Sequence, residues 1–395
     1  MALAPAGAAW AAWAAWAAAA LAAVLTAALA GCGAQPSPPP ASGAPGTSPP
    51  TAGQPPAWRT WCRVTPPPGL AAQLGRTVPE SLRGEVIPIG MAGRLAYVSA
   101  WTPRFSGVAA LNLATGALRP IRAFAHPARD QADGSSGGRW LAWEETVSLQ
   151  SLDRFTVYAW DQVTGRLLTL GRSLSGPGGA AWPSPWHPPA VSGDYAAWAQ
   201  GYGPGGEVEV RLADLETGRV RVIRQGHTQP PFFDGNLLVW PESDRPGTLT
   251  TLRAISLRTG RPAALPAVLS AVRGTDVVVT DGTRTAYLGP DLTTLYYSPA
   301  QDQRARVALR LPAGAYFAGL ALGPGTLAWT TTAATYLAST RTGAYAQVTP
   351  QYGDAAGSGA DLMISDPPSE KVTHPVLPMH LVSPAGIRWP SCPAR

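Results

Sequence analysis

A Thr-Gly pair that recurs after strand-like apolar stretches constrains the fold of this chain more than any other feature. The gaps between successive pairs are 49, 53, 42 and 83 residues, and 83 is close to twice 42. A degenerate copy is therefore expected near residue 301, in the polar turn 300–303, and a further step of similar length ends at Ala385-Gly386. The repeat predicts seven units of roughly 40 to 55 residues. The pairs are Thr115-Gly116, Thr164-Gly165, Thr217-Gly218, Thr259-Gly260 and Thr342-Gly343.

A second marker keeps the same spacing: a short apolar triplet that ends in an aromatic residue. Weaker copies occur at 277–280 and 362–364. We interpret each unit as an inner strand that contains the triplet, a loop, a second strand, a Gly turn and an alternating outer strand such as 220–223. Because no amphipathic helix separates the units, the sequence predicts an all-β fold and argues against a parallel α/β fold. The clear triplets are Leu95-Ala96-Tyr97, Leu141-Ala142-Trp143, Ala196-Ala197-Trp198, Leu238-Val239-Trp240 and Leu327-Ala328-Trp329.

An inner strand ending in Trp, followed by a turn such as Asp214-Leu-Glu-Thr-Gly218-Arg219, resembles the repeats of TolB-like proteins and of bacterial and archaeal surface β-propellers. The resemblance covers about residues 85 to 392. It implies an all-β β-propeller of seven blades. The alternative is six blades, with the segment after Tyr352 as an irregular cap.

Two cysteines lie at the ends of this region, which a closed propeller must bring together. Cys62 stands at its start and Cys392 three residues before the end of the chain. We expect a disulfide between them, which would join the last blade to the N-terminal strand. The alternative is two unpaired thiols.

The N-terminal 31 residues predict a lipoprotein signal peptide. Ala30 and Gly31 are small residues before Cys32, whose thiol would carry the lipid after cleavage, and palmitate is the expected label. An uncleaved signal anchor is the alternative, because the apolar segment 8–30 is long enough to span a bilayer. No side chain before Cys32 is charged, so the usual positive start of a signal peptide is missing. The predicted address is the extracytoplasmic face of the cell membrane.

A proline-rich, uncharged stretch over 33–57 follows the lipidated cysteine. Such a segment favours extended polyproline conformation and would form a tether of up to roughly 80 Å. The predicted domains are therefore the signal peptide at 1–31, Cys32 with its linker at 32–57, and the propeller at 58–395.

The tether contains no charged residue, so all 30 basic and 24 acidic residues follow Ala57. The arginines are scattered singly, which argues against nucleic acid. Anionic headgroups or wall polymers remain an alternative partner.

Two catalytic-type motifs do not have the context that their chemistry requires. Residues 134–138, Gly-Ser-Ser-Gly-Gly, match a nucleophile elbow but precede an apolar strand, so we interpret them as a Gly-rich loop. Residues 201–206 match a dinucleotide fingerprint, but Pro204 and the strand after it leave no helix to hold a pyrophosphate. That segment is expected to be a hairpin loop. Zinc-type spacings and a calcium loop are also missing.

Three histidines are the remaining site candidates. His126, His187 and His227 each fall in the connection that enters a new unit, and such connections gather on one face of a propeller around its axis. Three imidazoles there could bind a ligand, either an anion or a transition-metal ion. The alternative is that they are ordinary loop residues, and no metal or cofactor is assigned.

The sequence therefore predicts a membrane-anchored extracytoplasmic propeller that binds an envelope protein, a polymer or a small ligand, with no catalysis assigned. The alternative is a propeller enzyme, such as a lyase, a lactonase or a quinone-dependent dehydrogenase, with its site on the axial face. A converging set of His, Asp, Glu or Arg side chains would favour the enzyme.

Overall fold

The computed structural model divides the chain into two units, Met1–Trp58 and Arg59–Arg395, and only the second contains described residues. The predicted signal peptide, Cys32 and the tether therefore lie outside the described residues. Within the described part, no helix is long and apolar enough to cross a bilayer. The structure describes residues 61–75, 85–93, 95–127, 130–146, 154–182, 185, 187–203, 206–245, 248, 250–350, 355–358, 361–365 and 379–393.

Antiparallel sheets make up nearly all of this unit, and each follows the chain as a simple meander. The first sheet contains β2 (Glu85–Ala92), β3 (Leu95–Thr102), β4 (Phe105–Asn112) and β5 (Leu118–Ala123). The second contains β6 (Gln131–Gly137), β7 (Trp140–Thr146), β8 (Phe155–Asp161) and β9 (Leu167–Arg172). The third contains β10 (Ala190–Ser192), β11 (Tyr195–Gly201), β12 (Val208–Asp214) and β13 (Arg219–Gly226).

The remaining sheets are less regular. The fourth has only three strands, β14 (Phe232–Asp234), β15 (Leu237–Glu242) and β16 (Thr251–Ser256), followed by the short helix α3 (Ala267–Ser270). The fifth contains β17 (Val278–Thr280), β18 (Thr285–Leu288), β19 (Thr294–Ser298) and β20 (Arg306–Arg310). The sixth contains β21 (Phe317–Gly323), β22 (Thr326–Thr331), β23 (Thr335–Ser339) and β24 (Ala344–Thr349). The last contains β25 (Ala355–Ser358), β26 (Asp361–Ser365) and β27 (Met379–Val382).

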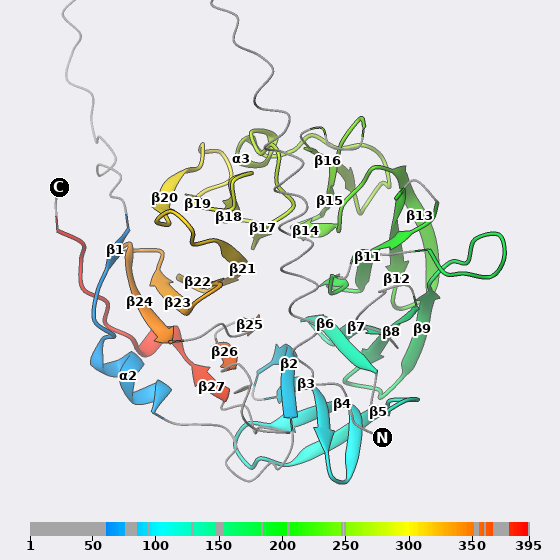
Figure 1. Cartoon of the computed structure of the whole chain (residues 1–395), viewed down its shortest axis with the longest axis horizontal. Coiled ribbons are helices and arrows are strands. Elements are labelled where there is room, and N and C mark those ends of the chain that lie inside the picture. Colours follow the sequence, from blue (N-terminus) through cyan, green and yellow to red (C-terminus); the bar gives the residue numbers. More distant parts are fainter. Residues whose placement is uncertain are drawn as a thin grey trace, which may run out of the picture. The chain divides into compact units, whose positions relative to one another are not determined.

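The first strands of the sheets form a closed ring. β2 contacts β6, β6 contacts β10, and the series continues through β14, β17, β21 and β25 back to β2 (Figure 1). Each sheet therefore runs outward from a common axis as a blade, and the predicted all-β propeller fold is confirmed. The segment after Tyr352, which the six-blade alternative treats as a cap, forms β25 to β27 between the sixth sheet and the first. Six blades are counted without this sheet and seven with it.

The five clear apolar triplets lie on the second strands of their sheets and not on the innermost strands, so that part of the prediction is wrong; only the weaker copy at 277–280 falls on an innermost strand, β17. Trp143, for example, is on β7, the second strand of its blade, and Trp198 is on β11. The innermost strand before Trp143, β6, consists of small and polar residues (Gln-Ala-Asp-Gly-Ser-Ser-Gly). β6 approaches β10 closely at Gly137, where a Cβ atom would lie 2.7 Å from the Val191 carbonyl oxygen, so this position has no room for a larger side chain.

Four of the five clear Thr-Gly pairs mark the turn between the third and fourth strands, and Thr259-Gly260 follows β16, the last strand of the three-stranded sheet. In each clear copy the glycine N–H donates to the carbonyl four residues earlier, as from Gly165 to Asp161 at 2.8 Å, and the glycine φ lies between 67° and 75°. Glycine reaches this left-handed region without the steric cost of a Cβ atom. The residue that starts the turn caps it with its side chain: Asp161 accepts from the N–H of Val163 at 2.9 Å. The repeat is therefore a local turn rule copied along the chain.

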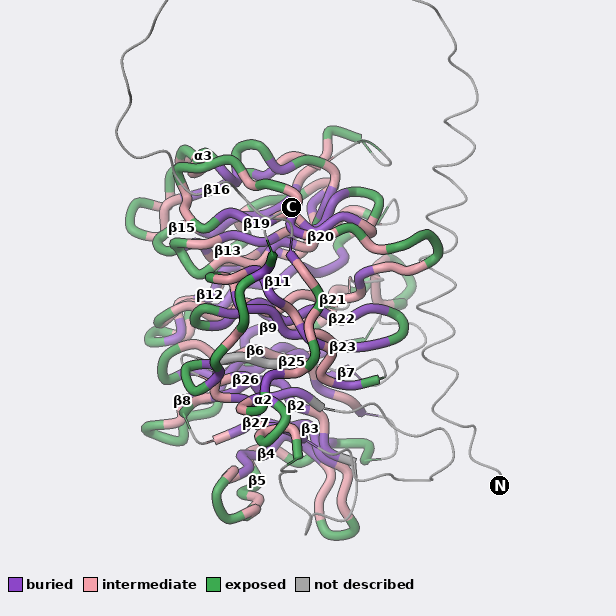
Figure 2. The backbone as a smooth tube through the Cα atoms, turned by 90° about the vertical axis from the view of Figure 1, so that its left-hand side faces the viewer, coloured by how far each residue is buried: buried purple, intermediate pink, exposed green. Residues whose placement is uncertain are grey.

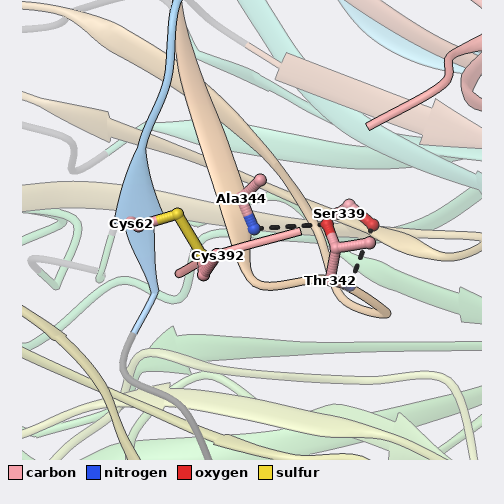
Figure 3. Close-up of a disulfide and its surroundings, with 5 residues drawn as sticks. All are labelled: Cys62, Ser339, Thr342, Ala344 and Cys392. Atoms are coloured by element: carbon pink, nitrogen blue, oxygen red, sulfur yellow. Dashed lines mark hydrogen bonds between the residues drawn. A yellow bond between two sulfur atoms is a disulfide. The ribbon is translucent and has the colours of Figure 1, made fainter. Parts of the chain in front are cut away.

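The two ends of the described unit close the ring together. β1 (Cys62–Arg63) runs parallel to β24 and adds a fifth strand to the sixth sheet. Cys62 forms a disulfide with Cys392, whose Cα lies 5.7 Å away, and the predicted pairing is confirmed (Figure 3). Helix α2 (Pro68–Leu74) contacts β27, and Gln73 accepts from the Ser383 N–H at 2.6 Å, just before the 3₁₀ helix η1 (Pro384–Gly386).

The core lies between the blades, where the faces of neighbouring sheets pack together. Trp143 and Tyr158 of the second sheet pack with Tyr97 of the first, and Trp140 packs with Trp198 of the third. Figure 2 shows buried residues concentrated along the strands and exposed residues mainly at the turns. Along β7, the odd-numbered side chains therefore face the first blade and the even-numbered ones face the third.

Candidate functional site

Each blade has two ends with different connections. We call one the turn face, which contains the Thr-Gly turns, and the other the loop face, which contains the connections from one blade to the next. His126 lies between β5 and β6, His187 between β9 and β10, and His227 between β13 and β14. All three predicted histidines are therefore in loop-face connections.

His126 is held by an aspartate of its own loop. Its Nδ1 lies 3.3 Å from Oδ1 of Asp130, and its backbone N–H donates to Oδ2 of Asp130 at 2.7 Å. The Asp130 side chain is fully buried, while that of His126 is 62% exposed. A buried carboxylate thus fixes the backbone of this loop and lies beside an imidazole that is largely open to solvent, an arrangement suited to binding or to proton transfer.

The other two histidines have different surroundings. His187 is exposed, and its Nδ1 lies 3.1 Å from the carbonyl of Pro188. His227 is half-buried, and its carbonyl accepts from the Ser243 N–H at 3.0 Å. Within the described part of the chain, no three His, Cys, Asp or Glu side chains lie close enough together to hold a metal. The structure therefore does not assemble the three imidazoles into a metal site, and a ligand site near the axis stays a prediction.

A group of interacting polar side chains, which the sequence analysis missed, lies between the first and second blades. Arg122, on the outermost strand β5, donates from Nε to Oε2 of Glu145 on β7 at 3.0 Å. Its guanidinium also lies 4.1 Å from the centroid of the Tyr158 ring. Burial raises the pKa of Glu145, the Arg122 charge opposes this shift, and Asp130 adds to it. Asp130, the aspartate beside His126, is therefore electrostatically coupled to this buried carboxyl.

The same ion pair recurs two blades further on. Arg224 on β13 donates to Glu242 on β15, and the Trp240 Nε1 donates to Oε2 of Glu242 at 3.1 Å. In the third blade the Trp198 Nε1 donates to Oε1 of Gln200 at 3.2 Å. The sequence signal was therefore available: each aromatic that ends a clear triplet in these three blades is followed two residues later by Glu or Gln.

A second buried carboxyl faces the third blade. Glu144 is 1% exposed, its Oε2 has no hydrogen-bond partner among the described residues, and Asp133 lies opposite it in register on β6. Burial raises the pKa of Glu144 well above its ordinary value, and the charge of Asp133 adds to the shift. Gln200, fully buried on the facing side of β11, likewise has an Nε2 without a described partner. An acceptor and a donor thus remain unsatisfied in the same interblade layer, which suits a bound water.

Replacing Glu144 by glutamine is expected to stabilise the protein at neutral pH. The folded state holds a proton on Glu144 that the unfolded state releases once the pH exceeds the ordinary glutamate pKa. Wild-type stability therefore falls as pH rises from that value toward the raised one. Glutamine does not ionise, so the variant does not lose stability in this way. Its free energy of unfolding should match that of wild type near pH 4. Its advantage should grow by about 1.4 kcal/mol per pH unit over that interval. Denaturant titrations from pH 4 to 8 would measure this.

An exposed glutamate provides the control for this experiment. Glu216, whose side chain is 60% exposed, should give no pH-dependent gain when replaced by glutamine. A Glu144→Gln protein whose stability relative to wild type stays constant from pH 4 to 8 would contradict a raised pKa at Glu144.

The two rejected motifs occupy different elements. Residues 134–138 are not a Gly-rich loop: 134–137 belong to β6, and that part of the prediction is wrong. Ser136 donates from Oγ to the Met91 carbonyl at 2.6 Å, and Ser135 donates to the Pro189 carbonyl at 2.5 Å. Both serine hydroxyls thus link innermost strands to their neighbours, and neither stands on a strand-to-helix turn. In the second motif, Gly201 ends β11, and the described residues 202, 203 and 206 lie between β11 and β12, as predicted for a hairpin loop.

Comparison with known proteins gives a likeness of fold alone. Neither a family model nor a curated protein matches the sequence. A solved prolyl endopeptidase is 14% identical over 81% of this chain and 50% of that one, with a TM-score of 0.51. The chain therefore spans about half the length of that protein. An oligogalacturonate lyase from Vibrio parahaemolyticus is 10% identical over 77% and 92% of the two chains, with a TM-score of 0.48. The β-propeller domain of the Trilobed protease from Pyrococcus furiosus is 10% identical over 72% and 89%, with a TM-score of 0.46.

Proposed function

We propose that this protein is a lipid-anchored propeller on the extracytoplasmic face of the cell membrane, where it acts as a binding scaffold. Its repeats are of the TolB-like kind, its anchor is a lipidated Cys32, and the segment 33–57 is its tether. The partner is another envelope protein or a polymer, and no reaction is assigned. The Cys62–Cys392 disulfide carries this proposal.

The disulfide supports the address in two ways. Disulfides persist in oxidising compartments outside the cytoplasm. The chain has only three cysteines, and ring closure uses two of them, so Cys32 is the one cysteine left for another role. That cysteine follows an apolar segment and two small residues, which is the sequence context of lipid attachment.

The scaffold role is supported by how the loop-face residues are held. The His126 imidazole stands on a loop fixed by the buried Asp130, and Arg122 is fixed by Glu145 and Tyr158. Side chains held on a closed ring lose little conformational entropy when a partner binds, which favours recognition. Crosslinking on intact cells, followed by affinity capture of the chain, would identify the partner.

Replacement of Cys32 by alanine is expected to abolish lipid labelling and to release the protein from the membrane. Wild-type protein should incorporate radiolabelled palmitate and sediment with membranes. Cys62→Ala serves as the control, because it removes a cysteine that carries no lipid in this account, and it should still be labelled. A Cys32→Ala protein that is still labelled and still processed would contradict the lipoprotein hypothesis. One that is unlabelled but remains membrane-bound would favour the uncleaved anchor.

The His126–Asp130 pair favours a second candidate, a propeller enzyme with its site on the loop face. An imidazole beside a buried carboxylate is a common general base. His126→Gln would then remove turnover and leave binding intact. A scaffold would instead show altered binding in the same variant and no turnover in either protein.

A further inference from the structure

Charge is distributed unevenly across the blades. Of the seven outermost strands, β5, β9, β13, β16, β20 and β1 contain arginine, β27 does not, and none of the seven contains aspartate or glutamate. The carboxylates of the blades lie further in, as at Glu145 on β7 and Asp161 on β8. The sequence shows arginines scattered singly along the chain, but the fold gathers them at its outer rim.

Five arginines, two of them on β13 and three in turns, form a row across three neighbouring blades at the turn face. Its members are all exposed and lie in or next to the Thr-Gly turns. Arg166 reaches the next blade's turn and donates to the Glu216 carbonyl at 2.9 Å. Arg221 likewise reaches the following turn, where a Cβ on Gly260 would lie 3.0 Å from its Nη1. We call this set the arginine row: Arg166, Arg219, Arg221, Arg258 and Arg261.

The arginine row lacks matching negative charge. Among the described residues, no carboxylate lies within ion-pair distance of any of its members. Glu216, in the same turn as Gly218, lies 3.7 Å from Arg139 instead. Asp214, opposite Arg219 in register, accepts from the Thr217 N–H at 2.9 Å and caps its turn. Like charges held close together repel one another, so a bound anion would stabilise this surface.

We propose that the arginine row binds a linear, phosphate-bearing polymer of the cell envelope. One guanidinium group can donate two parallel hydrogen bonds to two oxygens of the same phosphate, which a lysine ammonium group does not do. A row that crosses three blades matches a chain with repeated charges, whereas a single small anion would contact only one or two of its members. This inference rests on the proposed scaffold function, since it names the class of partner.

The arginine row and the N-terminal strand of the fold lie on different blades. The segment that follows the tether enters the fold at β1, in the sixth sheet, while the row lies on the second, third and fourth sheets. β1 and β13 stand on opposite sides of the ring (Figure 1). The row therefore lies on the far side of the ring from β1.

Binding of fluorescent inorganic polyphosphate to the full chain, purified in neutral dodecyl maltoside, tests this inference. Fluorescence anisotropy should show binding whose affinity falls steeply with salt, as for other linear phosphate polymers. The double variant Arg219→Gln, Arg258→Gln should bind at least about tenfold more weakly at low salt, and its log–log salt slope should be smaller by about 2.

A matched pair of arginines on another blade provides the control. Arg304, in the connection from β19 to β20, and Arg310, the last residue of β20, are both exposed, and replacing both by glutamine removes the same charge from outside the row. Equal weakening in both double variants, or no binding by wild type, would overturn the inference. So would displacement of polyphosphate by the lipid POPG mixed into the micelles, because the occupant would then be an anionic membrane. The assay does not depend on lipidation, so its failure is separable from failure of the proposed anchor.

Discussion

Loss of the Cys62–Cys392 disulfide is expected to lower the free energy of unfolding by about 2 to 5 kcal/mol. The two cysteines are 330 residues apart, so the bond closes a loop that contains nearly the whole folded unit. Without it, β1 is held to the sixth sheet by backbone bonds, such as Cys62 N–H to the Gly343 carbonyl at 3.0 Å, and by packing of the buried Trp61 ring on Trp329. The last sheet, β25 to β27, should then separate from β1 more readily.

Denaturant unfolding of the Cys62→Ser, Cys392→Ser double variant measures this effect. Cys32→Ser makes the same chemical change outside the folded unit and should leave its stability unchanged. Adding a reductant to wild type should reproduce most of the loss. Wild-type and double-variant proteins with the same unfolding midpoint would show that the disulfide does not stabilise the ring.

Replacement of Gly137 by alanine is expected to destabilise the fold by about 1 to 3 kcal/mol or more. Gly137 ends β6, and a Cβ there would lie 2.7 Å from the Val191 carbonyl oxygen and 3.0 Å from its carbon. Both atoms belong to the backbone of β10, the innermost strand of the next blade, so they cannot rotate away. The two blades would have to move apart at the axis.

Gly75→Ala provides the matched control, because it makes the same change where there is room. Gly75 ends helix α2 at φ −70°, and the nearest atom to a Cβ would be 3.5 Å away. Alanine there should be neutral or slightly stabilising. If Gly137→Ala proved as stable as Gly75→Ala in thermal unfolding, the close contact of innermost strands would be refuted.

The features that the sequence predicted correctly are those set by local rules or by ring closure. A Thr-Gly turn needs only a capping side chain and a glycine at positive φ, so it is visible residue by residue, as at Asp161 and Gly165. The disulfide followed from the fold, since a propeller brings its two ends together. The loop-face position of His126 followed from the order of strands in a meander.

The features that the sequence analysis missed depend on neighbouring blades. β6 has no apolar alternation, because it is packed between β2 and β10 and its small residues fit that space. Arg122 and Glu145 belong to different sheets, and only the packing of the first blade on the second brings them together. Asp130 could be found as a neighbour of His126 in the chain, but its complete burial is a tertiary property.

The central claim is an oxidised propeller anchored outside the cytoplasm through Cys32. The intact mass of protein extracted from membranes, measured without reductant, tests it most directly. The account predicts a chain that begins at Cys32, carries the mass of a lipid modification on that residue, and lacks two hydrogens because Cys62 and Cys392 are joined. A chain that begins at Met1 without lipid and has three free thiols would contradict it.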